Sequence, residues 1–183
     1  MKKTTLVIHP KDKTTTFLER IYQNLPNKTV VTEGLRRSDI LRMIRTHDRV
    51  IMLGHGSPRG LLNTGQFPDC TYVIDSQMVS MLSQKKNNVF IWCHADEFVD
   101  RYNLKGFYSG MFVSEVGEAR YERIPEPTQL QVDESNGWFS NVLGNCINRN
   151  TEEIFETVIE GYGDLTSTNK IALLNHSRLY FRV

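Results

Sequence analysis

Short apolar runs alternate with segments of helical periodicity over much of this chain, and this alternation is the strongest constraint on its fold. The runs of strand length are residues 6–9, 29–32, 49–54, 88–93 and 110–114. Apolar side chains recur at helical spacing between them, in residues 17–25, 39–44, 75–84 and 96–102. Nearly continuous apolar strands that alternate with helices are typical of a parallel sheet with helices on both faces. We therefore expect an α/β fold of three layers, α/β/α, with a mostly parallel central sheet.

Capping and turn residues mark the ends of several of these segments. Thr14 or Thr15 is suited to cap the first helix, which Pro26 ends. Asp75 is suited to cap the third helix. A glycine and a proline lie among β-forming residues between 61 and 73, which predicts a small hairpin outside the main sheet.

The chain after residue 120 predicts two further helices. Residues 138–147 and 154–159 each carry a stripe of apolar side chains at helical spacing. The tail from 171 to 183 fits either an edge strand or a packed extension. No repeat, low-complexity segment or linker divides the 183 residues. We therefore expect a single domain over 1–183, in which residues 121–183 pack on the first 120.

The composition argues against several broad classes of protein. Twenty-two Lys and Arg against 21 Asp and Glu give a formal net charge of +1, with both signs interspersed, which predicts neither a nucleic-acid partner nor an anionic membrane. No run of about 18 apolar residues occurs, so no membrane span is expected. The apolar stretch near the start is three residues long, which predicts a strand and not a signal peptide.

The three cysteines favour a reducing compartment, and one of them lies where a reactive thiol is expected. Cys70, Cys93 and Cys146 are odd in number and form no Cys-x-x-Cys pair, which favours a reducing compartment, and we expect a cytoplasmic protein. Cys146 falls on a helical stripe and is predicted to lie in the core. Cys93 instead comes where an apolar strand gives way to polar residues, which predicts a thiol at the strand end.

Two of the predicted strands end on chemically capable side chains. Residues 49–54 lead into His55, and residues 88–92 lead into Cys93. The carboxyl ends of parallel strands form the ligand-binding edge of such sheets, and neighbouring strands lie about 5 Å apart. We therefore expect His55 and Cys93 at one edge, together with His9 at the end of the first strand. A thiol beside an imidazole is a nucleophile with its base.

Three other chemistries fit the spacing less well. A phosphatase loop needs an arginine six positions after its cysteine, where this chain has Val99. A metal site of His9, Cys93, His94 and Asp96 lacks a compact ligand pair, so the sequence predicts no metal and no cofactor. A flavodoxin-like domain that binds an anion or a nucleotide remains an alternative, although the loop after the first strand contains no glycine.

The two strand ends resemble a known clan of enzymes. Gly54-His55-Gly56 after one apolar strand, followed some forty residues later by a second such strand ending in Cys93-His94, resembles the cysteine peptidases that include caspases, metacaspases, gingipains, legumains and separases. The small excursion and the helix between the two motifs also resemble that clan. The similarity covers about residues 1 to 120.

The resemblance implies a caspase-like sheet and a cysteine endopeptidase. Cys93 would attack a peptide carbonyl, His55 would manage the protons, and the amides of Gly56 and Cys93 would hold the oxyanion. The partner would be a protein or peptide substrate. The chain carries no pattern that indicates an oligomeric state.

The substrate pocket is less defined by this resemblance. Metacaspases carry an acidic residue two positions before the cysteine, whereas this chain has Ile91, so specificity for basic side chains is not implied. Candidate pocket residues near the two motifs are His9, Asp96, Ser114 and Glu115. The alternative function is a non-catalytic, caspase-like regulatory or binding module that keeps the fold and both residues.

Overall fold

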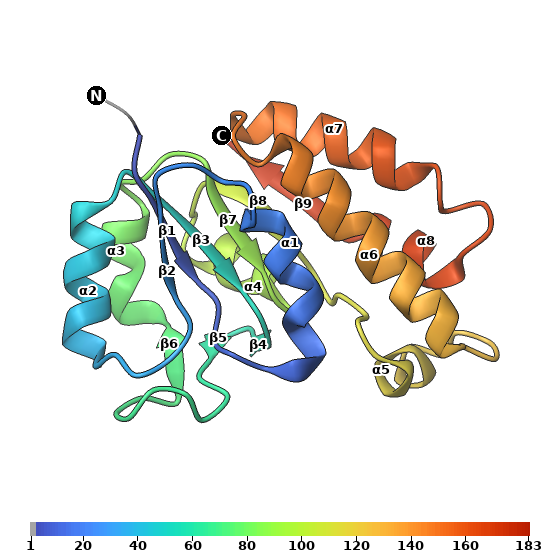
Figure 1. Cartoon of the computed structure of the whole chain (residues 1–183), viewed down its shortest axis with the longest axis horizontal. Helices are drawn as coiled ribbons and strands as arrows, with labels where there is room; N and C mark the ends of the chain where they lie inside the picture. The colour runs from blue at the N-terminus through green and yellow to red at the C-terminus, as the bar shows by residue number, and fades with distance from the viewer. Residues whose placement is uncertain (1–2) are drawn as a thin grey trace.

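A six-stranded sheet forms the centre of the computed structural model, which describes residues 3–183; the first two residues of the predicted domain, Met1 and Lys2, lie outside this range. The strand order is β2-β1-β3-β7-β8-β9 (Figure 1). These strands are β1 (Thr5–Ile8), β2 (Lys28–Val31), β3 (Arg49–Leu53), β7 (Asn88–Ile91), β8 (Gly106–Ser109) and β9 (Leu179–Arg182). Every pairing from β2 to β8 is parallel, and β9 joins the edge antiparallel to β8. The predicted, mostly parallel sheet is confirmed.

Helices cover both faces of this sheet (Figure 1). One face packs against the 3₁₀ turn η1 (Lys13–Leu18), α1 (Glu19–Tyr22), α6 (Gln129–Cys146) and α7 (Thr151–Gly163). The other face packs against α2 (Arg37–Thr46), the 3₁₀ turn η2 (Ser76–Met78), α3 (Val79–Leu82) and α4 (Ala95–Arg101). The fold therefore has the three layers expected from the sequence.

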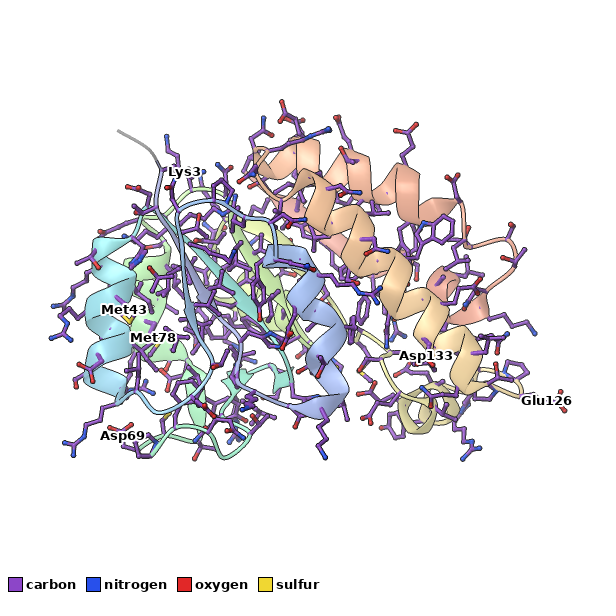
Figure 2. All side chains as sticks on the ribbon, in the orientation of Figure 1. Lys3, Met43, Asp69, Met78, Glu126 and Asp133 are labelled. Carbon is purple, nitrogen blue, oxygen red and sulfur yellow. The ribbon has the colours of Figure 1, made fainter. Side chains whose placement is uncertain are left out.

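The strands are apolar along their length because both of their faces are buried. Val7, Ile51 and Val89 face α6 and α7, whereas Leu6 and Val50 face α2 and α3. Side chains of a strand point alternately to opposite faces, so each run contributes to two cores. In Figure 2 the labelled Met43 and Met78 lie between α2 and α3, in the core of the second face.

The predicted excursion after the third strand is a small antiparallel sheet. It contains β4 (Gly56–Ser57), β5 (Gly60–Leu62) and β6 (Tyr72–Ile74), in that order. Gly60 has φ +141°, and a Cβ at this position would lie 1.9 Å from the carbonyl oxygen of Ile74, so only glycine fits. The β5–β6 pair is the hairpin that the sequence predicts, and β4 extends it back to the end of β3.

One predicted strand is wrong, and one predicted helix has other bounds and another cap than expected. The strand expected at 110–114 lies earlier, at β8, where Gly106 pairs with Asn88; its φ of +152° and the closeness of the Asn88 carbonyl both require glycine. The helix expected over 17–25 is the 3₁₀ turn η1 followed by the single α-helical turn α1, and its cap is Asp12 and not Thr14 or Thr15. Asp75 caps η2 as expected.

Two short helices that the sequence pattern does not predict pack against α6 after the chain leaves β8. These are α5 (Val116–Tyr121) and α8 (Lys170–His176), which share a small core with α6. Buried Asn175 of α8 accepts a hydrogen bond from the Val113 N–H (2.7 Å) and donates to the Val113 carbonyl (2.8 Å). One amide side chain therefore replaces a strand partner for a buried segment of backbone.

We predict that Asn175→Ala destabilises the protein by about 2–4 kcal/mol, because both backbone groups of Val113 lose their partner inside the core. Urea unfolding followed by circular dichroism measures the change. The matched control is Asn145→Ala on the exposed side of α6, which should change the free energy of unfolding by less than about 0.5 kcal/mol. Equal stability of the two variants would contradict the prediction.

Candidate functional site

His55 and Cys93 both lie at the carboxyl edge of the sheet, at the ends of adjacent strands. Leu53 of β3 pairs with Ile91 of β7, and the next residue, Gly54, donates from its N–H to the Ile91 carbonyl (3.0 Å). Both side chains line one small cavity, of about 20 Å³, which is room for one water molecule. The cavity is lined by Thr15, Phe17, Leu18, Gly54, His55, Ile91, Trp92, Cys93, Phe112 and Ser114.

The His55 ring is held by a hydroxyl and a carboxylate from the loop after β1. Nε2 of His55 lies 2.6 Å from Oγ1 of Thr14, and this Oγ1 lies 2.6 Å from Oδ1 of Asp12. Asp12 Oδ1 is itself 3.7 Å from Nε2. The Thr14 hydroxyl also holds the pKa of the Asp12 carboxyl below its usual value, so Asp12 is ionised at neutral pH.

This chain of contacts selects one tautomer of His55. An ionised carboxylate only accepts, so the Thr14 hydroxyl donates its single proton to Asp12. The Thr14 oxygen then accepts from His55, which places the ring proton on Nε2 and leaves Nδ1 unprotonated. Nδ1 has no hydrogen-bond partner within residues 3–183 and is therefore available as a base.

Cys93 sits at a sharp turn between β7 and α4. The following residue, His94, has φ 66° in the left-handed region, so the chain leaves the strand and enters the helix within a few residues. The Sγ of Cys93 donates to the Phe112 carbonyl (3.4 Å) and not to His55. Its own N–H has no backbone acceptor within the described part of the chain.

The Cys93 thiol is protonated at neutral pH. Burial is the main cause that raises its pKa to about 12, and the carboxylates of Glu118 and Glu122 add to this shift. A thiol in this environment reacts slowly by itself. Any nucleophilic role therefore requires a base that removes the proton during attack.

The N–H of Gly56 in β4 is directed away from the neighbouring strand β5. Leu62 donates from its N–H to the His55 carbonyl, and Ser57 pairs with Gly60, so the Gly56–Leu61 pair between them is the non-hydrogen-bonded kind. A Cβ at Gly56 would lie 2.1 Å from the Trp92 ring. Only glycine allows this approach, which fixes β4 against the end of β7.

Trp92 completes the link between the two strand ends. It is buried in the core that faces α2 and α3, and its indole Nε1 donates to the Ser57 carbonyl (3.2 Å).

The predicted pocket residues lie in different surroundings. Ser114 lines the cavity, and its N–H and hydroxyl both donate to Glu118. Asp96 lies in the first turn of α4 with one buried carboxylate oxygen that has no partner in residues 3–183, and Glu115 precedes α5. Neither of these two acids lines the cavity, and His9 does not line it.

His9 is a buried member of the network behind the site. It is 3% exposed, and its ring nitrogens lie 3.0 Å from the Tyr22 hydroxyl and 3.1 Å from the Thr15 hydroxyl. Burial is the main cause that lowers its pKa to about 4. His9 is therefore neutral at pH 7 and supports Thr15, which lines the cavity.

The sequence pattern does not indicate Asp12, Thr14 or Glu118 as site residues. Asp12 and Thr14 form a capping pair, Asp-x-Thr, after the first strand, and this pattern is a usable sequence signal for η1. Their approach to His55 depends on tertiary structure, because even Thr14 is separated from His55 by 41 positions. Within residues 3–183, no group of three or more His, Cys, Asp or Glu side chains is arranged to hold a metal ion.

We predict that His9 makes the protein less stable as the pH falls from about 6.5 to 4. The unfolded chain binds a proton on this histidine below pH 6.5, whereas the folded protein does so only near pH 4, so up to about 3 kcal/mol is lost across this window. Urea unfolding at pH 7, 5.5 and 4 measures the loss. His9→Gln should remove that part of the pH dependence, whereas His47→Gln should keep it; an unchanged slope in His9→Gln would refute the prediction.

Comparisons with known proteins assign the chain to no family. No family model matches it, and no curated protein matches its sequence. Among solved structures, it is similar to the RcsB response regulator of Salmonella typhimurium, with 12% identity, coverage of 97% of this chain and 98% of that one, and a TM-score of 0.35. No helix in residues 3–183 is long and apolar enough to cross a membrane.

Proposed function

We propose that this protein is a cysteine endopeptidase of caspase-like type, with Cys93 as nucleophile and His55 as general base. The observation that carries the proposal is the shared cavity, which His55 and Cys93 reach from the ends of adjacent parallel strands. The substrate would be a protein or peptide, and the compartment would be the cytoplasm.

The proposed peptide cleavage begins with a proton on the Cys93 sulfur and none on Nδ1 of His55. As the Cys93 sulfur forms a bond to the peptide carbonyl carbon, its proton passes to the unprotonated Nδ1 of His55. The amides of Gly56 and Cys93 donate to the oxyanion. His55 then returns the proton to the leaving amine as the C–N bond breaks, and a water molecule hydrolyses the thioester and regenerates the thiol.

The raised pKa of Cys93 makes the base essential in this scheme. A thiol with a pKa of about 12 holds almost no thiolate at pH 7, so a preformed thiolate–imidazolium pair is not the starting state. Asp12 and Thr14 are then positioning residues, since they hold His55 in the tautomer that accepts a proton at Nδ1 and stabilise the imidazolium that forms.

A non-catalytic module with the same fold is the second candidate. The specific observation in its favour is that the half-buried thiol lines a cavity of only about 20 Å³ and donates to a backbone carbonyl. A binding module would show no turnover that depends on His55. The flavodoxin-like alternative has no comparable observation at this edge.

We predict that Cys93→Ala abolishes cleavage of any peptide that the protein cuts and abolishes labelling by a thiol-reactive, acyl-type inhibitor. A peptide library analysed by mass spectrometry identifies the cleaved bonds, and His55→Ala should remove the same products. Cys70→Ala, which changes a half-buried thiol away from the cavity, is the control and should keep activity. Full activity in Cys93→Ala would exclude the mechanism; the absence of turnover in wild type would favour the binding module.

We also predict that Thr14→Val lowers kcat by about tenfold to a hundredfold with little change in KM. The general base His55 is still present in this variant, but the hydrogen bond that orients its ring is lost. Thr14→Ser should restore most of the activity. Thr16→Val is the matched control, since the Thr16 hydroxyl contacts only backbone carbonyls. The measurement is the pH profile of kcat, whose acidic limb reports deprotonation of the general base and should shift in Thr14→Val; an unshifted profile with normal kcat would show that Thr14 has no positioning role.

A further inference from the structure

The irregular segment that follows β8 forms one wall of the small cavity at the candidate site. Residues 111–114, which we call the strap, connect Gly110 at the sheet edge to α5 and lie in the yellow part of the chain in Figure 1. Phe112 and Ser114 of the strap line the cavity, and the Phe112 carbonyl accepts from Sγ of Cys93 (3.4 Å). The strap is therefore in direct contact with the thiol.

The backbone of the strap is not paired with any other backbone. Among residues 3–183, no backbone–backbone hydrogen bond reaches residues 111–114. Gly110, just before the strap, is held on both sides, since its N–H donates to the Arg178 carbonyl and its carbonyl accepts from the His94 N–H. The chain thus passes from a residue that is fixed by backbone bonds into four residues that are not.

Side chains hold the strap in place instead. Besides the thiol of Cys93, Asn175 binds both backbone groups of Val113, Asn136 donates from Nδ2 to the Ser114 carbonyl (3.0 Å), and Glu118 accepts from the Ser114 N–H (2.7 Å). Such contacts can be broken without unpairing a strand or unwinding a helix. Segments of this kind open at a lower free energy than the elements around them.

One aromatic ring of the strap packs between two others. The Phe112 ring is 4% exposed, and its centroid lies 4.6 Å from that of Phe139 in α6 and 6.4 Å from that of Phe17 in η1. Phe17 is only partly buried, and it lines the same cavity as Phe112. Withdrawal of Phe112 therefore enlarges the cavity on the side of Phe17.

A peptide bond does not fit into the cavity while the strap is in place. The volume of about 20 Å³ is room for one water molecule, whereas attack requires a carbonyl carbon about 3–3.5 Å from Sγ of Cys93. The other lining residues lie in η1, in β7 or directly after β3 and β7. The strap is the part of the wall that can move without loss of backbone hydrogen bonds.

We propose that the strap is an autoinhibitory lid, which covers Cys93 in the resting protein and must move away before a peptide can reach the thiol. This inference rests on the proposed function, because covering the thiol is inhibitory only where Cys93 is the nucleophile. The small size of the cavity, which favours a non-catalytic module, is in this scheme the closed state of a peptidase. Asn136 is the latch, since its Nδ2 donates to the strap from α6.

The test compares the rates at which methyl and benzyl methanethiosulfonate modify each cysteine of the full chain, followed by mass spectrometry of its peptides. In both reactions the thiolate displaces methanesulfinate and forms a mixed disulfide, so the thiolate fraction of Cys93 cancels in the ratio of the two rates. Cys70, a half-buried thiol outside the cavity, gives the reference ratio. The benzyl reagent should be disfavoured at Cys93 by about tenfold or more relative to Cys70, because the larger group requires an open strap. Equal ratios at the two cysteines would overturn the proposal.

Variants of Asn136 assign the effect to the strap. Asn136→Leu keeps a side chain of similar size but removes the donor to Ser114, so the benzyl reagent should modify Cys93 about fivefold to tenfold faster, as expected for one lost hydrogen bond. Asn136→Ala serves where the leucine does not fit. The matched control is Asn145→Ala on the exposed side of α6, which should leave the ratio at Cys93 unchanged.

Cys146 separates opening of the strap from unfolding of the whole protein. It is 1% exposed in the core and should stay unmodified in every variant. A rise at Cys146 equal to that at Cys93, or an unchanged ratio at Cys93 in both Asn136 variants, would overturn the proposal. Peptide cleavage is not part of this measurement. A wild type without peptidase activity would therefore contradict the proposed function and the inhibitory role of the strap, while the ratio at Cys93 decides separately whether the strap covers the thiol.

Discussion

The parallel pairing of β3 with β7 is the interaction on which the rest of the structure depends. It joins the two central strands of the sheet, whose side chains are buried on both faces, and it continues past the strands through the bond from Gly54 to Ile91. Two residues that are 38 positions apart in sequence, His55 and Cys93, thereby reach one cavity. Helices pack on both faces of the sheet that carries this edge.

The carboxylates around the candidate site act differently on Cys93 and on His55. The carboxylates of Glu118 and Glu122 disfavour a thiolate at Cys93, whereas Asp12 favours a positive charge on His55 through Thr14. Both effects act on the transfer of one proton from sulfur to nitrogen, and they act in opposite directions. The resting protein therefore holds a protonated thiol at Cys93, while the contact with Thr14 favours the tautomer of His55 that carries its proton on Nε2.

Much of the fold and part of the site could be predicted from the sequence. Apolar runs identified four of the five parallel strands, and the position of His55 and Cys93 at strand ends follows from those runs. The fifth parallel strand was placed too late, because pairing of Gly106 with Asn88 sets its register and no local pattern encodes this. The role of Thr14 could not be predicted for a similar reason. Its contact with His55 is a tertiary contact, and the sequence pattern by itself indicates only a helix cap. The pKa of Cys93 depends on burial and on α5, which has no strong apolar periodicity.

The contact between Asn175 and Val113 bears on when the cavity can form during synthesis. Phe112 and Ser114, which line the cavity, flank the residue that Asn175 holds from α8. His55 and Cys93 leave the ribosome long before Asn175, so a growing chain contains both reactive side chains without the wall that encloses them. The order of the sequence thus delays completion of the site until nearly the whole described chain has been made, and a truncated translation product would carry an open, unformed site.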